Sequence, residues 1–403
     1  MPGPGMDLIG QEEIDEVLDL LNSGYLLRYG KPENPDFSAK VYRLEQEIAH
    51  RCQVPYAIGV NSGTSALLTG LLGLEVGPGD EVIVPGYTFV ASIAAIIYAG
   101  AVPVLAEIDQ SFNLDPGDVK RKITSRTKAI LVVHMLGSPA RMEEILGLAE
   151  EYGLKVIEDC AQAFGGHYRG QPLGSLGDVG CFSFNGYKTI TAGDGGMLVM
   201  RDETLYKRCF AIHDQGHHPN RTGVEIGERS LIGLDFRLTE LQAAVLLAQL
   251  KKLDGMLDHL KENKALYKAL LADLPGITFR TLPDPDGDIA TLLVVVFDTR
   301  AEAEQVAREL GSKVIAESGW HVYNHMEHIL SLRTPTERHN PLQHPAYPDT
   351  GGTRLQKGML PRTDELLSRA MNLSIGVVDP GLGAGFGVSV QDDAAAVSES
   401  AAR

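Results

Sequence analysis

Basic residues and cysteines are both scarce in this sequence of 403 residues. The 36 Lys and Arg are outnumbered by 53 Asp and Glu, which gives a formal net charge of −17 at pH 7. Because nucleic acids and anionic membranes are themselves negative, we expect neither to be a partner. The four cysteines, Cys52, Cys160, Cys181 and Cys209, are too few and too scattered for a disulfide framework or a zinc knuckle.

Long apolar runs and a signal peptide are also missing. The most apolar stretch, residues 91–106, contains Ser92, Gly100 and Pro103, so it favours a buried helix followed by a strand over a membrane span. The first residues contain no basic region followed by an apolar core. We therefore expect a cytoplasmic protein with reduced cysteines.

Short apolar runs alternate with helical stretches from residue 56 onward. The predicted strands are 57–60, 81–84, 102–106, 129–133, 155–159, 181–184 and 196–200, and helical spacing occupies 65–74, 89–99 and 142–152. Strands that are apolar throughout and alternate with helices predict an α/β fold with a mainly parallel sheet between helices. Ligands of such sheets bind at the carboxyl ends of the strands.

The pattern changes after about residue 254, which predicts a second, smaller domain. A strong helix over 239–253 continues to about 271, and a turn-rich break precedes a strand at 291–297 and a helix at 301–310. We predict a large domain over 1–254, including N-terminal helices, and a smaller α+β domain over 255–385. The polar, Gly- and Ala-rich residues 386–403 predict a disordered tail.

Residues 61–66 lie between a predicted strand and a predicted helix and could bind a phosphate. Gly63 permits a tight turn, after which the N–H groups of Thr64 and Ser65 would point out of a helix N-terminus. A plain Ser/Thr helix cap is the alternative interpretation.

Two later segments offer a carboxylate and an amine. Asp159 ends a buried predicted strand, where it could hold a protonated ring nitrogen or, equally, cap the next helix. Lys188 lies in a turn rich in glycine and hydroxyl groups. In a poorly solvated pocket its amine would lose a proton readily and become a nucleophile, whereas an exposed loop lysine is the ordinary alternative.

Phe89 begins a predicted helix and could stack on a planar ring or belong to the core. Together the four segments supply a phosphate cup, a partner for a pyridinium nitrogen, a stacking face and an amine for a Schiff base. Those are the groups that an enzyme dependent on pyridoxal 5'-phosphate (PLP) provides.

Four motifs, in this order and spacing, resemble those of the DegT/StrS family of PLP-dependent sugar aminotransferases: SGTSA, VIEDCAQA, GDVGCFSFNGYKTITAGDGG and LDFRLTELQAA. The resemblance covers most of 8–260 and continues weakly to about 375. Within the family the chain is most similar to the 8-amino-3,8-dideoxy-octulosonate aminotransferases, which act on eight-carbon sugars. That similarity is carried by residues 2–10, 133–138, 213–217 and 283–288.

The resemblance implies the PLP-dependent transferase fold type I and a role for each motif residue. Lys188 would form the Schiff base and shuttle a proton, and Asp159 would keep the pyridinium nitrogen charged. The remaining cofactor contacts would come from Gly63, Thr64, Ser65 and Ser183 at the phosphate, Phe89 on the ring face and Gln162 at the ring oxygen.

The resemblance also implies a homodimer with shared active sites, and one residue departs from the family at that point. The family commonly has Asn where this chain has Asp235, and that Asn reaches the phosphate in the partner subunit. A carboxylate would be repelled by the phosphate. Asp235 therefore either turns away, for example to Arg237, or the contact between subunits is lost.

We predict substrate contacts from Arg28, Tyr29, His134, His217, His321 and Tyr323. His134 follows a buried strand and could instead be a satisfied core residue. His321, His325 and His328 stand at near-helical spacing, but the segment is not HExxH, so we predict no metal site.

The predicted reaction moves an amino group from glutamate or glutamine to a keto or aldehyde group of a sugar in amino-sugar or antibiotic biosynthesis. The acceptor could be a nucleotide-linked sugar, a long-chain sugar acid or a keto-cyclitol. A PLP-dependent keto-sugar dehydratase is an alternative, but there a histidine replaces the lysine, and Lys188 is present. A non-enzymatic regulatory protein is a further alternative, and a dinucleotide-dependent oxidoreductase would need a GxGxxG that residues 61–66 do not provide.

Overall fold

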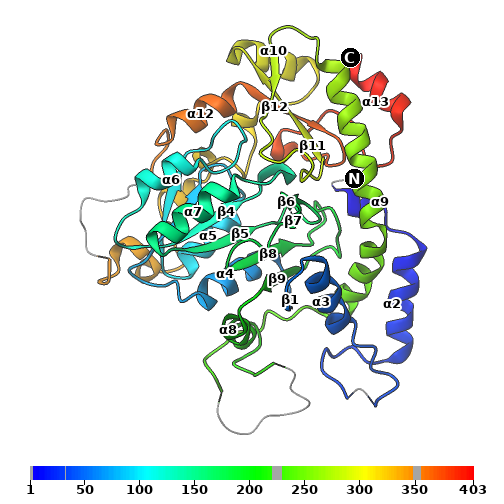
Figure 1. The fold of residues 1–403 in the computed structure, drawn as a ribbon, viewed down its shortest axis with the longest axis vertical. Helices are drawn as coiled ribbons and strands as arrows, with labels where there is room; N and C mark the ends of the chain where they lie inside the picture. The colour runs from blue at the N-terminus through cyan, green and yellow to red at the C-terminus, as the bar shows by residue number, and fades with distance from the viewer. Residues whose placement is uncertain (1–2, 32, 220–228, 348–354) are drawn as a thin grey trace.

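The computed structural model describes residues 3–31, 33–219, 229–347 and 355–403. A seven-stranded sheet in the order β1-β9-β8-β5-β4-β2-β3 forms its centre (Figure 1). Strand β9 is antiparallel to both neighbours, and the other six strands are parallel to one another. The strands are β1 (Tyr56–Val60), β2 (Glu81–Pro85), β3 (Val102–Ala106), β4 (Thr127–Val133), β5 (Lys155–Asp159), β8 (Val179–Ser183) and β9 (Gly196–Met200). The mainly parallel sheet predicted from the apolar runs is confirmed.

Alternate side chains of these strands enter two apolar layers, one on each face of the sheet. In β2, for example, Ile83 joins one layer and Val82 and Val84 join the other. Helices cover both layers because a strand that is apolar throughout must be buried on both sides. One face carries α4 (Gly63–Gly73), α5 (Val90–Tyr98) and α8 (Glu203–His213), and the other carries α3 (Lys40–Arg51), α6 (Pro116–Lys122) and α7 (Met142–Tyr152).

Helix α9 (Glu240–Leu271) runs along one side of the molecule (Figure 1). Thr239 and Gln242 form a capping box that starts it. Helix α2 (Gln11–Ser23) packs on its first half, where Gln249 donates to Glu13. Because α9 passes through residue 254 without a break, no change of secondary structure marks the predicted domain boundary, which stays a prediction.

The chain after α9 forms a second sheet. Its strands are antiparallel and lie in the order β10 (Ile277–Phe279), β11 (Leu292–Phe297) and β12 (Ala370–Ser374). Its helices are α10 (Arg300–Glu309), α11 (Glu327–Leu330) and α12 (Pro361–Ser368). Elsewhere the chain forms α1 (Pro4–Asp7), a hairpin of β6 (His167–Tyr168) and β7 (Gln171–Pro172), and short 3-10 turns at Met135–Gly137, Ile315–Glu317, Tyr323–His325, Glu337–His339, Pro341–Gln343 and Pro380–Leu382. None of the described helices combines the length and apolarity needed to cross a bilayer.

The prediction of a disordered tail over 386–403 is wrong. Helix α13 (Ala394–Ala401) begins after Asp393, whose side chain accepts two backbone N–H groups, and packs beside the second half of α9 (Figure 1). Val397 is fully buried, and the hydroxyls of Ser400 and Tyr267 lie 3.0 Å apart. The prediction rested in part on the alanine content of this segment. Alanine is also the strongest helix former, and α9 supplies the surface on which the helix packs.

Candidate active site

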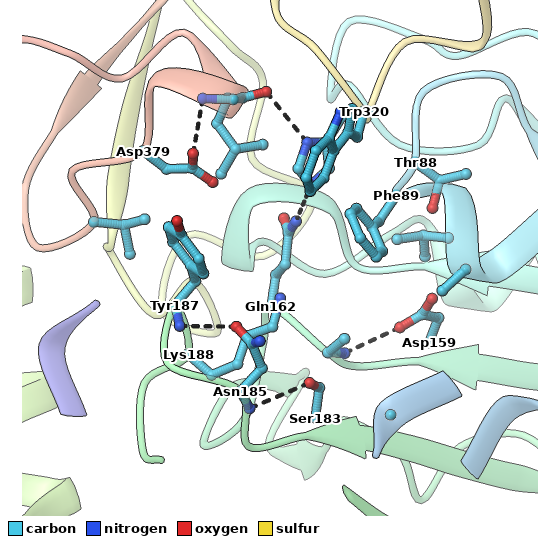
Figure 2. A pocket seen from close by; sticks show the side chains of 18 of the residues that line it. Thr88, Phe89, Asp159, Gln162, Ser183, Asn185, Tyr187, Lys188, Trp320 and Asp379 are labelled. Atoms are coloured by element: carbon cyan, nitrogen blue, oxygen red, sulfur yellow. Dashed lines mark hydrogen bonds between the residues drawn. The ribbon is translucent and has the colours of Figure 1, made fainter. Parts of the chain in front are cut away.

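A cavity of about 540 Å³ lies at the carboxyl ends of the parallel strands. Its lining comes from two parts of the chain, residues 62–194 and 291–382. Eight of the predicted site residues line it together: Gly63, Thr64, Phe89, Asp159, Gln162, Ser183, Lys188 and His321. Figure 2 labels five of them: Phe89, Asp159, Gln162, Ser183 and Lys188. The motifs are far apart in sequence, yet the sheet brings them to one place.

Asp159 ends β5 and is buried at the cavity wall. The Ser92 hydroxyl donates to its Oδ2 at 2.7 Å, and the Ala161 N–H donates to its Oδ1 at 3.1 Å. The Thr88 hydroxyl supports Ser92 at 2.7 Å. Burial raises the pKa of Asp159, although the Ser92 and Ala161 hydrogen bonds oppose that rise. A cationic ring nitrogen in the cavity would favour the ionised form.

Lys188 lies in the turn after β8, and its backbone N–H donates to the Asn185 carbonyl at 2.9 Å. Its side chain lines the cavity, so the alternative of a solvated loop lysine is wrong. Burial lowers the pKa of Lys188, against the opposing effect of the Asp159 and Asp379 carboxylates. The Lys188 amine is therefore easier to deprotonate than a free lysine, as a nucleophile or proton carrier requires.

The N-terminus of α4 reaches the cavity because Gly63 packs against β8. A Cβ on Gly63 would lie 2.7 Å from the Cβ of Ser183, so no larger residue fits without moving the helix. Ser62 caps α4 by accepting the Ser65 N–H at 3.1 Å, and the Ser65 hydroxyl donates to Asn61 at 2.6 Å. The Ser65 side chain is thus committed to the cap and does not line the cavity, and its phosphate contact stays a prediction. Ser62, Thr64 and Ser183 supply the hydroxyls instead.

A chain of hydrogen bonds fixes the protonation of His321. The Leu136 N–H donates to Gln162 Oε1 at 2.8 Å, so the Gln162 amide nitrogen is the donor towards His321 Nε2, 3.3 Å away. His321 Nδ1 must then carry the proton that reaches the Gly381 carbonyl at 3.4 Å. Burial and the nearby Lys188 lower the pKa of His321 to about 3, so the ring is neutral near pH 7.

Two predicted substrate residues belong to the core instead. Fully buried His134 accepts the Ala140 N–H at Nδ1 and contacts Glu158 through Nε2 at 3.0 Å. Glu158 precedes Asp159 in β5 and therefore points to the opposite face of the sheet, away from the cavity. Tyr323 is also fully buried, and its hydroxyl donates to Asp364 at 3.0 Å. The predicted substrate contacts of His134 and Tyr323 are wrong.

Three other predicted substrate residues do not line the cavity of their own chain, and their substrate contacts stay predictions. Arg28 forms an ion pair with Glu45 at 2.8 Å, the Tyr29 hydroxyl donates to Asp214, and His217 is buried away from the cavity.

Asp235 turns to Arg237, and the Arg237 Nη2 donates to the Asp235 Oδ2 at 2.6 Å. This is one of the two predicted outcomes for Asp235. Any role of Asp235 in the partner subunit's site stays a prediction.

Trp320 lines the cavity and is 72% exposed. Its ring centroid lies 6.3 Å from that of Phe89, and His321 lies 5.3 Å from Phe89. Sequence reasoning missed several other lining residues. Asn185 and Tyr187 could have been found because they flank Lys188 in the glycine-rich turn, whereas Thr291 and Asp379 have no local motif around them.

Comparison with known proteins shows to which family this chain belongs. The sequence profile of the DegT/DnrJ/EryC1/StrS aminotransferase family matches residues 7–377. The chain belongs to this family. It is a PLP-dependent sugar aminotransferase, and its α/β architecture is that of the PLP-dependent transferases of fold type I.

Relatives of this aminotransferase act on different sugars. A GDP-perosamine synthase of Escherichia coli O157:H7 is 43% identical over 282 residues, which span 68% of this chain and 74% of that protein. A dTDP-3-amino-3,6-dideoxy-alpha-D-galactopyranose transaminase of Aneurinibacillus thermoaerophilus is 40% identical over 71% of this chain and 75% of its own. The S. venezuelae DesV structure, solved with a ketimine intermediate, has a TM-score of 0.74 and 32% identity and covers 97% of this chain and 95% of its own. The octulosonate branch stays a prediction.

Proposed function

We propose that this aminotransferase moves an amino group from glutamate or glutamine to the carbonyl carbon of a nucleotide-linked keto-sugar. The observation that carries the proposal is the placement of Lys188 and Asp159 in one cavity, with the pKa of the lysine lowered by burial. The relatives named for GDP- and dTDP-linked amino sugars support a nucleotide-linked acceptor over a free sugar acid.

The donor groups of the cavity fit PLP from end to end. The N-terminus of α4 with Thr64 and Ser183 suits a phosphate, the Phe89 ring suits a planar face, and Asp159 suits a protonated ring nitrogen. When bound, PLP supplies a carbonyl that carries the amino group between substrates and a ring that withdraws electrons.

The residues of the chain supply the acid–base chemistry around that ring. Lys188, in its neutral form, takes a proton from the reacting carbon and returns it, since burial keeps its amine from being permanently charged. Asp159 holds positive charge on the ring nitrogen, and Ser92 fixes the orientation of that carboxylate. Gln162, held by Leu136, directs one amide N–H to His321, which leaves the other for the ring oxygen of bound PLP.

Borohydride trapping tests the proposal directly. The purified protein should show a visible-absorbing Schiff base, and reduction should attach the cofactor to the peptide that contains Lys188. Lys188→Ala should abolish the adduct and lower amino transfer by about 1000-fold or more. Lys207→Ala, which removes an exposed lysine paired with Glu203, is the matched control. It should change neither the adduct nor the rate of amino transfer. An adduct at another lysine contradicts the proposal.

A panel of acceptors tests the substrate class. Keto-sugars linked to GDP, dTDP or UDP, a free keto-sugar acid and a keto-cyclitol are each offered with glutamate and with glutamine, and the aminated product is measured by mass spectrometry. We expect product from at least one nucleotide-linked sugar. Product only from the cyclitol or the free acid contradicts the nucleotide-linked acceptor while leaving amino transfer intact.

We also propose that the chain forms a homodimer. On α2, Ile14, Leu18 and Leu21 stand at helical spacing and are each 49% exposed, while the other side of the helix packs on α9. Leu26 and Leu27, which follow the helix in the chain, are 50% and 58% exposed, and we call these five side chains the α2 row. A row of large exposed apolar side chains is typical of an interface between subunits.

A further inference from the structure

One wall of the active-site cavity lies beyond the part of the chain that matches the family profile. The profile ends at residue 377, but Asp379, Gly381 and Leu382 line the cavity. Figure 2 shows Asp379 on the side of the cavity across from Asp159 and Phe89. A wall beyond the residues that the family profile matches is a natural place for residues that distinguish one substrate from another.

The Asp379 carboxylate is held rigidly at this wall. Its Oδ1 accepts the Gly381 N–H at 2.7 Å, and its backbone carbonyl accepts the N–H groups of Leu382 and Ala384 at 2.9 and 3.0 Å. The turn is anchored to β12, where the Asn372 amide donates to the Leu382 carbonyl at 2.6 Å. Within the described residues, no further hydrogen bond occupies Oδ2, which is left for a ligand.

The other carboxylates of the cavity cannot take the same role. Both oxygens of Asp159 already accept hydrogen bonds, from Ser92 and Ala161, and Asp194 is exposed at the margin. The described lining contains one cationic side chain, Lys188, and no arginine. A carboxylate on the acceptor would therefore meet Asp379 without a dedicated counter-charge, whereas sugar hydroxyls can donate to it.

We propose that Asp379 recognises hydroxyl groups of the acceptor sugar and disfavours acceptors that carry a carboxylate at that position. This inference rests on the proposed function and narrows its substrate to sugars that are neutral apart from their nucleotide phosphates. Asp379 acts on the choice and placement of the acceptor. Because the Asp379 carboxylate also opposes the lowering of the Lys188 pKa, the test measures binding of non-reacting probes and not turnover.

Two pairs of non-reacting probes test the inference, because the members of each pair differ in one carboxylate: UDP-glucose with UDP-glucuronate, and GDP-mannose with GDP-mannuronate. Trp320 is the single tryptophan of the sequence and lines the cavity, so its fluorescence reports binding to the PLP-loaded protein. We expect the wild type to bind the neutral member at least about tenfold more tightly in one pair or both.

Asp379→Asn should reduce that preference by about tenfold, because loss of the charge weakens the bond from the hydroxyl and removes the repulsion of the carboxylate. The Asn side-chain oxygen can still accept the Gly381 N–H, so the turn is retained, and Asp379→Ser provides a second variant. Asp273→Asn, an exposed site with the same change in charge, is the control and should leave the preference unchanged.

An unchanged preference in both Asp379 variants overturns the inference. So does a wild type that favours the carboxylated probes or binds none of the neutral ones. Borohydride trapping at Lys188 uses no probe, so it separates the two proposals. If trapping succeeds and the preference is unaltered, only the role of Asp379 fails; if trapping fails, the proposed function fails.

Discussion

At the scale of single residues, burial of Asp159 makes the stability of the cofactor-free protein depend on pH. Its pKa is raised above the unfolded value of 3.8, so the folded protein binds the proton more tightly. The resulting stabilisation is present at low pH and is lost as the pH rises through the raised pKa. Above that raised pKa the cofactor-free protein carries an unfavourable buried carboxylate, which a pyridinium would offset.

Asp159→Asn should separate stability from function. The Ser92 and Thr88 hydroxyls can rotate to accept from the new amide, so the cofactor-free variant should melt at the same temperature as the wild type or a few degrees higher. Added PLP should stabilise the variant less, and amino transfer should fall at least about 100-fold. Thermal melts with and without PLP measure this, and a variant that melts well below the wild type without PLP contradicts it.

His321 gives a prediction about pH. Because its pKa is about 3, the ring gains a proton only far below the working range and stays neutral from pH 5 to 9. His321→Asn should therefore lower kcat/KM by about tenfold through the lost contact with Gln162 but leave the shape of the pH profile unchanged. If the acidic limb of the kcat/KM profile disappears in the variant, His321 titrates in that range and the assignment is wrong.

At the scale of elements, α1 acts as a brace for the turn that carries Lys188. The Gly5 N–H donates to the Lys188 carbonyl at 3.4 Å. A Cβ on Gly5 would lie 2.9 Å from the backbone at Ile190 and Thr191, and one on Gly3 would lie 2.5 Å from the Tyr187 carbonyl carbon. These obstacles are backbone atoms, so a larger residue can fit only if α1 or the lysine turn moves.

Gly5→Ala should lower kcat by about tenfold, since a displacement below 1 Å at the Lys188 turn is enough to disturb its alignment. Gly255→Ala is the matched control, because Gly255 lies in the middle of α9 with open space around its Cα. The control should keep full activity and gain about 1 kcal/mol in the free energy of unfolding. Full activity in Gly5→Ala, at unchanged stability, would show that α1 does not brace the turn.

The elements also show what the sequence could and could not predict. Strands β2 to β5 were predictable because parallel strands buried on both faces are apolar along their whole length. Strand β12 was missed because Asn372 and Ser374 interrupt its apolar pattern, and both are buried with hydrogen bonds that only the folded chain provides.

The site residues also divide into those that a local motif reveals and those whose role depends on the folded chain. Lys188 and Asp159 were predictable from motifs in which neighbouring residues reveal the role. Asp379 has no such motif, because its place in the cavity depends on the pairing of β11 with β12. His134 and Tyr323 were misassigned because residue type suggested a polar contact, whereas Glu158 and Asp364 satisfy them in the interior.

At the scale of the whole molecule, the α2 row leads to a prediction about assembly. Leu18→Asp places a charge in the middle of the row and should shift the protein from twice the chain mass towards the single chain, as measured by light scattering during gel filtration. Asp15→Ala, on the same helix, is a control that should leave the mass unchanged. A wild type that elutes as a single chain contradicts the proposed homodimer.

The cavity lining is divided between residues 62–194 and residues 291–382. This division has a consequence for recombination between genes that encode members of this family. Lys188, Asp159, Phe89, Gln162 and the N-terminus of α4 precede residue 195, and the wall with His321 and Asp379 follows residue 290. A genetic crossover in the intervening codons would keep one parent's Lys188, Asp159 and α4 N-terminus and import the other parent's acceptor wall, including its counterpart of His321. New amino sugars could thus arise by recombination without any step that sacrifices the lysine machinery.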